Sequence, residues 1–407
     1  MSELSYLEKL LDGGEVKWLP LGKLGELVRG NGLPKSDFTE SGVPAIHYGQ
    51  IYTFYGLSTE TTKSFVSQET AKNLKKVNSG DVVITNTSEN FTDVGKALVY
   101  LGKEQAVTGG HATIFRPNST IIGKYFAYFT QTDSFANEKR KYSKGTKVID
   151  VSASDMAKIT IPIPCPDNPE KSLAIQSEIV RILDKFSALT AELTAELTAE
   201  LSMRKKQYNY YRDQLLSFKE DEVEGKRKTL GEIMKMRAGQ HISAHNIIER
   251  KEESYIYPCF GGNGIRGYVK EKSHDGEHLL IGRQGALCGN VQRMKGQFYA
   301  TEHAVVVSVM PGINIDWAFH MLTAMNLNQY ASKSAQPGLA VGKLQELKLF
   351  VPSIERQIYI AAILDKFDTL TNSITEGLPR EIELRQKQYE YYRDMLFSFL
   401  KPEVAEA

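Results

Sequence analysis

The sequence has few cysteines and no long apolar run, and these shortages exclude several classes of protein. Its three cysteines, Cys165, Cys259 and Cys288, follow no framework spacing and leave one unpaired in any scheme, so we expect reduced thiols. No apolar stretch approaches the roughly 18 residues of a membrane span, and no basic-then-apolar leader opens the chain. We therefore expect a cytoplasmic protein without a membrane span, a secretory signal or disulfide bonds.

A strong charge of either sign is also lacking. The formal net charge is +1 over 407 residues, whereas an autonomous nucleic-acid binder is often globally basic, although a local patch can suffice. One basic tract, residues 139–147, is either such a patch or an ordinary solvated face. If the protein binds DNA, its near neutrality indicates that partner subunits supply much of the positive surface.

Motifs of catalysis and cofactor binding are missing as well. Gly262–Gly267 has GxGxxG spacing, but strand and turn residues follow it instead of the helix that a pyrophosphate site needs. Gly338–Lys343 is one residue short of a P-loop, and no [ND]PP[YF] motif of amino-methyltransferases occurs. Two histidine pairs at i,i+4 have neither an HExxH motif nor a cysteine pair beside them, so we interpret them as loop histidines. These are His241 with His245 and His274 with His278. The sequence predicts no catalytic, cofactor-binding or metal-binding residue.

One long segment, by contrast, is present twice. Residues 182–219 and 363–400 align without a gap at an offset of 181, with 21 of 38 positions identical. This period is too long for a solenoid repeat and indicates two copies of a module made of a domain and a helix. The stretches before the two copies share only scattered anchors, so we expect two dissimilar heads carried on shared arms.

The anchors indicate that the two heads have the same fold. Both heads begin with an LG[KE][LI] motif, continue with a Gly-acid-apolar run and a His-Ala step, and close with a β-like stretch and proline. The anchors lie at 21–24, 80–84, 111–112 and 159–164 in the first head, and at 230–233, 276–280, 303–304 and 347–352 in the second. The N-terminus resembles the junction between the end of the first arm and the start of the second head, because residues 6–24 parallel 211–233. We therefore predict that residues 1–12 lie beside the C-terminal arm and close a pseudo-twofold ring.

The repeated segments have the pattern of long amphipathic helices. Apolar residues recur at three- and four-residue steps from Ile175 to Leu201, and no glycine or proline occurs from 170 to 224. Such a helix needs a partner along its length, and the second arm keeps its apolar positions 181 residues further on. The pattern predicts an antiparallel pair of arms, loosened or kinked in the second arm by Gly377 and Pro379.

Within the first arm, residues 190–201 read TAEL three times. One four-residue unit advances a helix by about 6 Å and turns it about 40° beyond a full turn. A DNA base pair advances about 3.4 Å and turns roughly 35°. The repeat is therefore either a ruler, in which one TAEL unit changes the gap between two DNA half-sites by about one or two base pairs, or simply a good helix-forming sequence.

The arm ends carry a repeated aromatic and basic motif, at 204–218 and 385–399. Most of its aromatic residues follow a heptad seam and are expected in the core, whereas Tyr210 and Tyr391 fall off the seam. A repeated exposed tyrosine beside basic residues suits a protein interface, and two copies imply two identical partners. The candidate partner-interface residues are Arg204, Tyr210, Arg212, Arg385, Tyr391 and Arg393.

The ILDKF and QKQYxYYRD motifs of both arms, the TAEL repeats and the IQSEIVRILDKF entry into the first arm resemble the specificity subunit of type I restriction-modification enzymes, in particular the IC-like subfamily. These motifs cover roughly a quarter of the chain. The resemblance implies a non-catalytic subunit whose two target-recognition domains read the halves of a split, asymmetric DNA site. It implies double-stranded DNA, two modification methyltransferase subunits and restriction/translocase subunits as partners, with phage DNA-mimic inhibitors as further ones. S-adenosylmethionine would belong to the modification subunits, and ATP and Mg²⁺ to the restriction subunits.

The expected fold is α+β, with two mixed α/β target-recognition domains in pseudo-twofold arrangement, joined by two long antiparallel, coiled-coil-like helical arms. The expected divisions are an N-terminal segment at 1–20 near the C-terminal arm, a first recognition domain at 21–164, a first arm at 170–219, a second recognition domain at 229–352 and a second arm at 354–400.

Base reading in the major groove needs amides for adenine and guanidinium or ammonium groups for guanine, carried on loops that reach the groove. Loop segments of both heads offer such side chains. The DNA-binding candidates are Lys35, Ser36, His47, Tyr48, Gln50, Asn86, Thr87, Ser88, Lys141, Lys144 and Lys147 in the first head, and Asn263, Arg266, Arg283, Gln284, Lys333, Ser334 and Gln336 in the second. The competing interpretation of each is an ordinary polar loop residue.

Two other classes of function remain as alternatives. A coiled-coil adaptor would use the arms to join proteins and would show no salt-dependent affinity for duplex DNA. A methyltransferase or nuclease acting alone would need a cofactor motif or clustered carboxylates, which the sequence does not contain.

Overall fold

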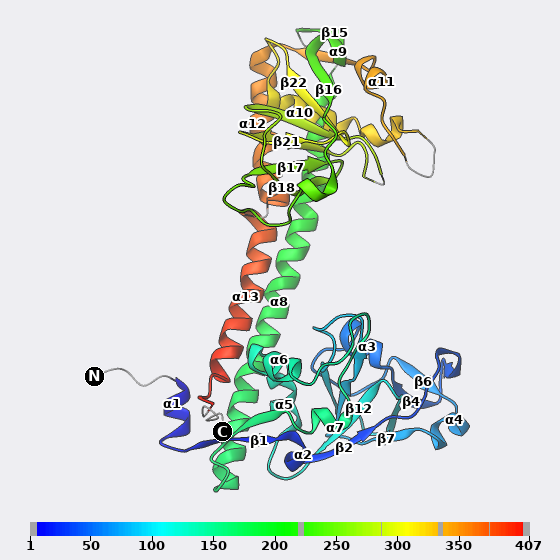
Figure 1. Ribbon diagram of the computed structural model, residues 1–407, viewed down its shortest axis with the longest axis vertical. Coiled ribbons are helices and arrows are strands. Elements are labelled where there is room, and N and C mark those ends of the chain that lie inside the picture. Colours follow the sequence, from blue (N-terminus) through cyan, green and yellow to red (C-terminus); the bar gives the residue numbers. More distant parts are fainter. Residues whose placement is uncertain (1–5, 219–223, 286, 333–336, 374, 402–407) are drawn as a thin grey trace. The chain divides into compact units, whose positions relative to one another are not determined.

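The computed structural model describes residues 6–218, 224–285, 287–332, 337–373 and 375–401 (Figure 1). The chain divides into two compact units, here called unit 1 (Met1–Ala195 with Glu383–Ala407) and unit 2 (Glu196–Ile382). Helices α8 (Pro169–Leu216) and α13 (Gly377–Leu396) contribute residues to both units. Both units are mixed α/β, as the sequence predicted.

Unit 1 is built on two five-stranded sheets. The first has the order β2-β12-β8-β10-β5, and its central strand is entirely buried, which explains the uninterrupted apolar run Val82–Ile84 in the sequence. Its strands are β2 (Gly25–Arg29), β5 (Ser58–Thr59), β8 (Val82–Thr85), β10 (Ala97–Tyr100) and β12 (Ala112–Pro117). The second sheet has the order β3-β6-β4-β11-β7, from β3 (Phe38–Thr39), β4 (Val43–Ile46), β6 (Ser64–Val66), β7 (Lys75–Val77) and β11 (Ala106–Thr108).

Short helices and two-stranded ribbons complete unit 1. The core between the first sheet and the arms is aromatic, with Phe115, Tyr125, Phe126 and Phe129 fully buried. The remaining elements are α1 (Tyr6–Leu11), β1 (Val16–Pro20), α2 (Leu21–Leu24), η1 (Lys35–Asp37), α3 (Tyr48–Thr53), α4 (Gln68–Lys72), β9 (Thr87–Ser88), α5 (Gly123–Phe129), α6 (Asp133–Arg140), β13 (Ile149–Asp150), α7 (Ala153–Met156) and β14 (Thr160–Pro164).

Unit 2 repeats this plan with fewer strands. Its sheets have the orders β16-β22-β19-β20 and β18-β17-β21. The strands are β15 (Gly225–Thr229), β16 (Met234–Ala238), β17 (Tyr257–Gly261), β18 (Gly264–Val269), β19 (Glu277–Gly282), β20 (Val291–Lys295), β21 (Tyr299–Ala300), β22 (Ala304–Val309) and β23 (Lys348–Pro352). The helices are α9 (Leu230–Ile233), η2 (Ala244–Asn246), α10 (Ile315–Ala324), η3 (Leu327–Tyr330), α11 (Val341–Gln345) and α12 (Ile354–Asn372).

The sequence anchors occupy matching elements in the two units. The LG[KE][LI] motifs form the short helices α2 and α9, and each is followed by an edge strand, β2 or β16. The Gly-acid-apolar runs enter the buried strands β8 and β19, and the His-Ala steps begin β12 and β22. Strand β1 pairs with β14 as β15 pairs with β23. The prediction that both heads have one fold is therefore confirmed.

The repeated arm motif makes the same ring contact in each unit. In unit 1, Phe186 of α8 lies 5.5 Å from Tyr392 of α13, between ring centroids. In unit 2, Phe367 of α12 lies 5.6 Å from Tyr211 of α8. Each pair joins the phenylalanine of one ILDKF motif to the second tyrosine of the other copy's YYRD motif, and the helices run antiparallel at both contacts, with α13 and α12 each beside α8 (Figure 1).

The aspartate of each ILDKF motif connects an arm helix to its head. Asp184 accepts hydrogen bonds from Tyr128 Oη at 2.8 Å and from Lys124 Nζ at 3.0 Å, both on α5. Asp365 lies 2.8 Å from Nε2 of the buried His320 on α10 and pairs with Arg293 on β20. Burial of Tyr128, together with its bond to Asp184, raises the pKa of its phenol.

The second arm is interrupted, as glycine and proline predicted. Helix α12 ends at Asn372 and α13 begins at Gly377. Gly377 has φ +78°, and a Cβ there would lie 2.6 Å from the carbonyl oxygen of Thr369, so this close approach requires glycine. The first arm, in contrast, is one helix, Pro169–Leu216.

The N-terminal segment contacts α8 near its first turns and the chain that follows α13. Tyr6 Oη donates to Glu178 of α8 at 3.3 Å, and the Trp18 indole donates to the carbonyl of Leu400 at 3.1 Å. Residues 1–5, part of the segment expected beside the C-terminal arm, lie outside the described residues.

Two features bear on the expected environment of the chain. All three cysteines are buried with free thiols. None of the helices in the described part of the chain combines the length and apolar character of a membrane span.

Candidate nucleic-acid interface

Three loops carry most of the candidate DNA-binding residues of each unit. In unit 1, loop A (47–50) follows β4 and consists of the N-cap and first turn of α3, loop B (86–96) joins β8 to β10, and loop C (141–150) follows α6. In unit 2, loop A (262–263) joins β17 to β18, loop B (283–290) joins β19 to β20, and loop C (331–339) follows η3. Residues 286 and 333–336 of these loops are outside the described residues.

Loop B is held by the same backbone hydrogen bonds in both units. Its first residue donates to the histidine carbonyl before the neighbouring strand, from Asn86 to His111 at 2.9 Å and from Arg283 to His303 at 2.8 Å. It is closed by a glycine in the left-handed region, Gly95 (φ +80°) or Gly289 (φ +91°), which donates at 2.8 Å to the residue before the loop. Asn86 and Arg283 therefore occupy equivalent positions.

Loop C returns to the same place in both units. The amide of Val151 donates to the carbonyl of Asn86 at 3.0 Å, and that of Leu339 donates to Arg283 at 2.9 Å. In unit 1 the strand β13 at the end of loop C pairs with β9 in loop B. In unit 2, Gln284 forms the corresponding bridge with Gly338. Loops B and C thus form one continuous edge in each unit.

Loop A contacts the edge formed by loops B and C through side chains in unit 1 and through the backbone in unit 2. In unit 1, the Tyr48 ring lies 4.9 Å from the His111 ring, and His111 Nδ1 lies 2.8 Å from Thr87 Oγ1. In unit 2, a Cβ on Gly262 would lie 3.1 Å from the carbonyl oxygen of Gln284, so glycines bring the two backbones together. The Gly262–Gly267 segment is a two-residue turn, 262–263, followed by the first residues of β18, and the residues after it continue as strand, as the sequence predicted.

The unit 1 candidates fall into exposed and half-buried sets. Lys35, Ser36, Lys141, Lys144 and Lys147 are exposed, whereas His47, Tyr48 and Gln50 are half-buried. Lys141 pairs with Glu138 at 2.6 Å, and Lys144 pairs with Asp155 at 2.8 Å. The charges of Lys141 and Lys144 are therefore partly neutralised by these carboxylates.

The structure corrects three unit 1 candidates. Asn86, Thr87 and Ser88 have exposed fractions of 0%, 9% and 9%, because the first residue of loop B is covered by the backbone bonds from loop C. In this structure they support the loop and do not present a base-reading surface. The Asn86 side-chain amide has no hydrogen-bond partner within the described residues.

His47 is the N-cap of α3, and its protonation state follows from its surroundings. Burial, with Lys35 and His111 nearby, lowers the pKa of its imidazole. Nδ1 of the neutral ring accepts the Gly49 amide at 3.2 Å, which leaves the proton on Nε2. His47 can therefore donate a hydrogen bond at neutral pH.

The unit 2 candidates are mostly accessible. Asn263, Arg266 and Gln284 are exposed, and Arg283 is half-buried with Nε donating to the carbonyl of Leu339 at 3.3 Å. The remaining three candidates lie outside the described residues: Lys333, Ser334 and Gln336.

The sequence interpretation missed two kinds of residue at this edge. In the sequence, His111 was noted only as part of the His-Ala step shared by the two heads. In unit 1 its ring contacts both loop A and loop B. Lys139 was counted within the basic tract, but it is 4% exposed and points into the protein. The sequence signal for this burial was that Lys139 lies four residues after Phe135, so that both side chains lie on the same face of α6.

The candidate partner surfaces are equivalent helix faces. Tyr210 and Tyr391 are 62% and 66% exposed, in agreement with their positions off the heptad seam. Arg212 pairs with its neighbour Asp213 at 2.8 Å. Arg204 bonds Glu200 and Gln207, and Arg385 bonds Gln388. Arg393 is 8% exposed because it packs into the core of unit 1, so its selection as an interface residue needs correction.

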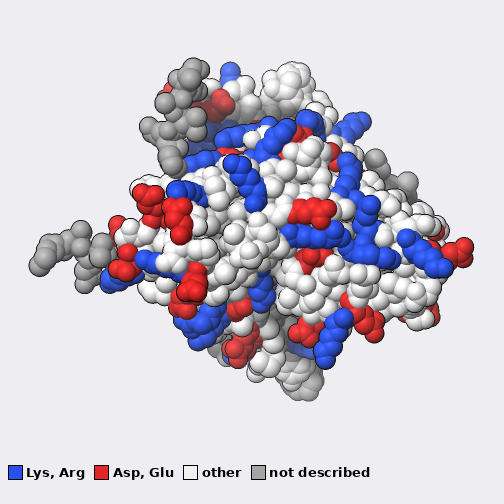
Figure 2. All heavy atoms as spheres, turned by 90° about the horizontal axis from the view of Figure 1, so that it is seen from below, with Lys and Arg blue, Asp and Glu red and all other residues white. Residues whose placement is uncertain are grey.

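Charge is interspersed on the molecular surface. Figure 2 shows Lys and Arg side chains most numerous across the upper middle and right of the face drawn, with Asp and Glu side chains among them and along the left and lower edges. Within the described residues, no three histidine, cysteine or carboxylate side chains gather as a metal site would require. In the part of the chain that the structure describes, the pairs His241/His245 and His274/His278 do not belong to a group of this kind.

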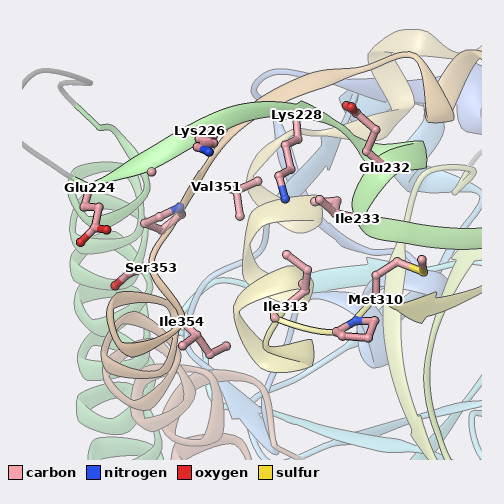
Figure 3. A pocket seen from close by; sticks show the side chains of 14 residues that line it. Glu224, Lys226, Lys228, Glu232, Ile233, Met310, Ile313, Val351, Ser353 and Ile354 are labelled. Atoms are coloured by element: carbon pink, nitrogen blue, oxygen red, sulfur yellow. The ribbon is translucent and has the colours of Figure 1, made fainter.

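Unit 2 also contains a pocket outside the three loops. It lies where β15 and β23 meet the segments that lead into α10 and α12 (Figure 3). Lys226, Lys228 and Glu232 border it, while Ile233, Ile313 and Ile354 line it. None of the candidate DNA-binding or partner residues borders this pocket.

The chain is similar to known proteins over nearly its whole length. The family model of the type I restriction modification DNA specificity domain matches residues 14–203 and 222–384. The type I restriction enzyme EcoprrI specificity subunit of Escherichia coli is 67% identical over 92% of this chain and 93% of that protein. The EcoR124I/EcoR124II specificity subunit of Escherichia coli is 42% identical over 99% of both chains.

Solved structures agree at the level of the fold. A chain of a type I R-M system, solved in a study of its complex assembly and conformational transition, has a TM-score of 0.64 at 16% identity, covering 95% of this chain and 99% of that one. The HsdS subunit from Thermoanaerobacter tengcongensis has a TM-score of 0.51 at 15% identity, covering 95% of this chain and 97% of that one.

Proposed function

Because the chain belongs to the type I restriction modification DNA specificity family, we propose that its two heads, 21–164 and 229–352, each read one half of a split, asymmetric DNA site. The arms, 170–219 and 354–400, set the gap between the half-sites, and the N-terminal segment, 1–20, packs near the C-terminal arm. The chain is the specificity subunit of its complex and leaves the chemistry to its partners.

One observation carries this proposal. The chain contains the edge formed by loops B and C twice, on equivalent backbone hydrogen bonds, with different side chains on each copy. A shared backbone frame with unlike polar side chains suits two readers of different base sequences. An adaptor that joined proteins without reading DNA would have no need of two such edges.

The arms provide the matching surfaces for partners. Tyr210 and Tyr391 are exposed at equivalent places of the repeated motif, and Arg212 and Arg385 belong to the same two motif segments. We propose that two copies of a modification methyltransferase dock there, that restriction subunits join the complex, and that phage DNA-mimic inhibitors compete for the DNA-reading edges. S-adenosylmethionine, ATP and Mg²⁺ would be bound by those partners in the cytoplasm, where the DNA lies.

The test is to express the chain with its modification subunits and to sequence the methylated bases of the host DNA. The expected result is adenine methylation in a single motif of two unlike halves separated by a fixed gap. The chain without modification subunits should leave the DNA unmethylated. A complex that forms but leaves no sequence-dependent methylation, and that binds duplex DNA with no dependence on salt, would support the adaptor instead.

A further inference from the structure

In both heads, a side chain from outside loop B donates a hydrogen bond to a backbone carbonyl at the same position of the loop. In unit 1 it is the carbonyl of Val94, and in unit 2 it is the carbonyl of Cys288. These residues are equivalent because each directly precedes the left-handed glycine that closes the loop, Gly95 or Gly289. A side chain from the helical segment that follows α5 or α10 donates to each carbonyl.

In unit 1 the donor is the buried ammonium of Lys139 on α6. Its Nζ donates to the carbonyl of Val94 and, at 2.8 Å, to that of Phe91, and it lies 4.3 Å from the centre of the Phe91 ring. Arg140 covers the same ring at 4.7 Å. The lysine therefore holds two carbonyls and one aromatic side chain of loop B together.

In unit 2 the donor is the amide of Asn328 on η3. Its Nδ2 donates to the carbonyl of Cys288 at 2.8 Å. The closing glycine also abuts the donor in each head: a Cβ on Gly289 would lie 2.4 Å from Asn328 N, and one on Gly95 would lie 2.8 Å from Lys139 Cδ. The two hydrogen bonds therefore join equivalent positions of the two heads through different functional groups.

We propose that Lys139 and Asn328 are equivalent positioning residues, each of which holds loop B of its own head in the shape that reads one half-site. The inference rests on the proposed function, because it assigns loop B to base reading. It adds that each half-site depends on one donor that touches no base, and that the two donors differ in chemistry.

The difference in chemistry makes one head sensitive to pH and leaves the other insensitive. Burial, with Lys96 and Arg140 nearby, lowers the pKa of Lys139 to about 8, and Asp93 opposes this effect. Above that pH the donor becomes a neutral amine, and its hydrogen bonds lose the charge that makes them strong. An asparagine amide does not titrate, and burial raises the pKa of the adjacent Cys288 thiol. Between pH 7 and 9, recognition by the first head should weaken while recognition by the second stays constant.

The experiment uses the complex with modification subunits and duplexes altered by one base pair in either half-site, once the methylated motif is known. Lys139→Met should reduce discrimination at one half-site about tenfold and leave the other unchanged. Asn328→Ala should do the reverse. Lys139→Gln keeps a donor that does not titrate, so it should retain discrimination at pH 7 and lose the change between pH 7 and 9.

Each outcome bears on the inference in a defined way. Wild-type protein that shows no methylated motif would refute the proposed function itself. Wild-type protein with a motif, but with Lys139→Met and Asn328→Ala affecting both half-sites equally at unchanged melting temperature, would overturn the positioning role alone. A Lys139→Gln variant that retains the pH dependence would also overturn the positioning role. Should Lys139→Met fail to fold, the Lys139→Gln pH profile and Asn328→Ala decide.

Discussion

At the scale of single residues, the reading edge combines side chains that reach solvent with side chains that shape the loop. Arg283 does both, because its backbone amide fixes loop B to His303 while its half-buried guanidinium lies at the edge. Its equivalent, Asn86, is wholly buried. One backbone position can therefore serve as a reader in one head and as a support in the other.

We predict that Arg283→Ala relaxes one base pair of the second half-site. Loss of a guanidinium that reads guanine should cost about 1–3 kcal/mol of cognate binding and little of the binding to random DNA. Binding of the complex to single-substitution duplexes measures this. Arg356→Ala is the matched control, since Arg356 lies on α12 outside the three loops. Equal losses on cognate and random DNA would make Arg283 a phosphate contact.

At the scale of elements, the ILDKF aspartates join an arm helix to a head. Asp365 illustrates the energetics: burial raises the pKa of its carboxyl, but the hydrogen bonds from His320 and Arg293 outweigh burial, so the net shift is downward. A carboxyl with a lowered folded-state pKa stabilises the fold above its unfolded pKa, near 3.9, and loses that contribution as pH falls through the folded value.

Asp365→Asn should therefore lower the free energy of unfolding of unit 2 by about 1–3 kcal/mol at neutral pH, because the buried His320 and Arg293 lose an anionic acceptor. The loss should shrink as pH falls below about 4, because the carboxyl is then protonated first in the unfolded chain and, at lower pH, in the folded wild-type protein as well. Chemical unfolding at pH 7 and pH 3 measures both. Asp368→Asn, one turn along the same helix, is the control, and a loss that does not vary with pH would contradict the assignment.

The exposed tyrosines of the arms give a second prediction at this scale. The double variant Tyr210→Ala with Tyr391→Ala should weaken binding of modification subunits by about 2 kcal/mol or more per site, because buried tyrosines dominate interface energies. Stability should stay within about 0.5 kcal/mol, since both rings are exposed. Titration calorimetry and thermal melting separate the two effects. Tyr359→Ala, 53% exposed on α12, serves as the control.

Most elements could be predicted from the sequence, whereas the accessibility of loop residues could not. Helix α8 follows from local periodicity and the absence of glycine and proline, and the break before Gly377 follows from backbone chemistry. The burial of Asn86 depends on Val151, far along the chain, and the inward direction of Lys139 depends on Phe91 and Val94. The burial of Asn86 comes from non-local packing, which composition and spacing do not encode, whereas for Lys139 the spacing from Phe135 indicates the buried face of α6 but not the loop that it contacts.

At the scale of the whole molecule, the TAEL repeats can be tested as a ruler. Deleting Thr194–Leu197 removes one unit from α8 and keeps the helix-forming character of the remainder. If the arms set the gap, the preferred spacing between half-sites should shrink by one base pair, or two, with both half-sites unchanged. Methylation of a library of spacings measures this. Replacing the same four residues with AAEL is the control, and unchanged spacing after deletion would leave TAEL as a helix-forming sequence only.

The frame of loop B is made of peptide groups, from the bond between its first residue and a histidine carbonyl to the bond from its closing glycine. Every residue except proline offers the same amide and carbonyl, so substitutions along the loop can accumulate without dismantling the frame. Under the proposed function, point mutations in loop B can therefore change the bases that it reads, provided that the closing glycine and the side chain that donates to the preceding carbonyl are kept.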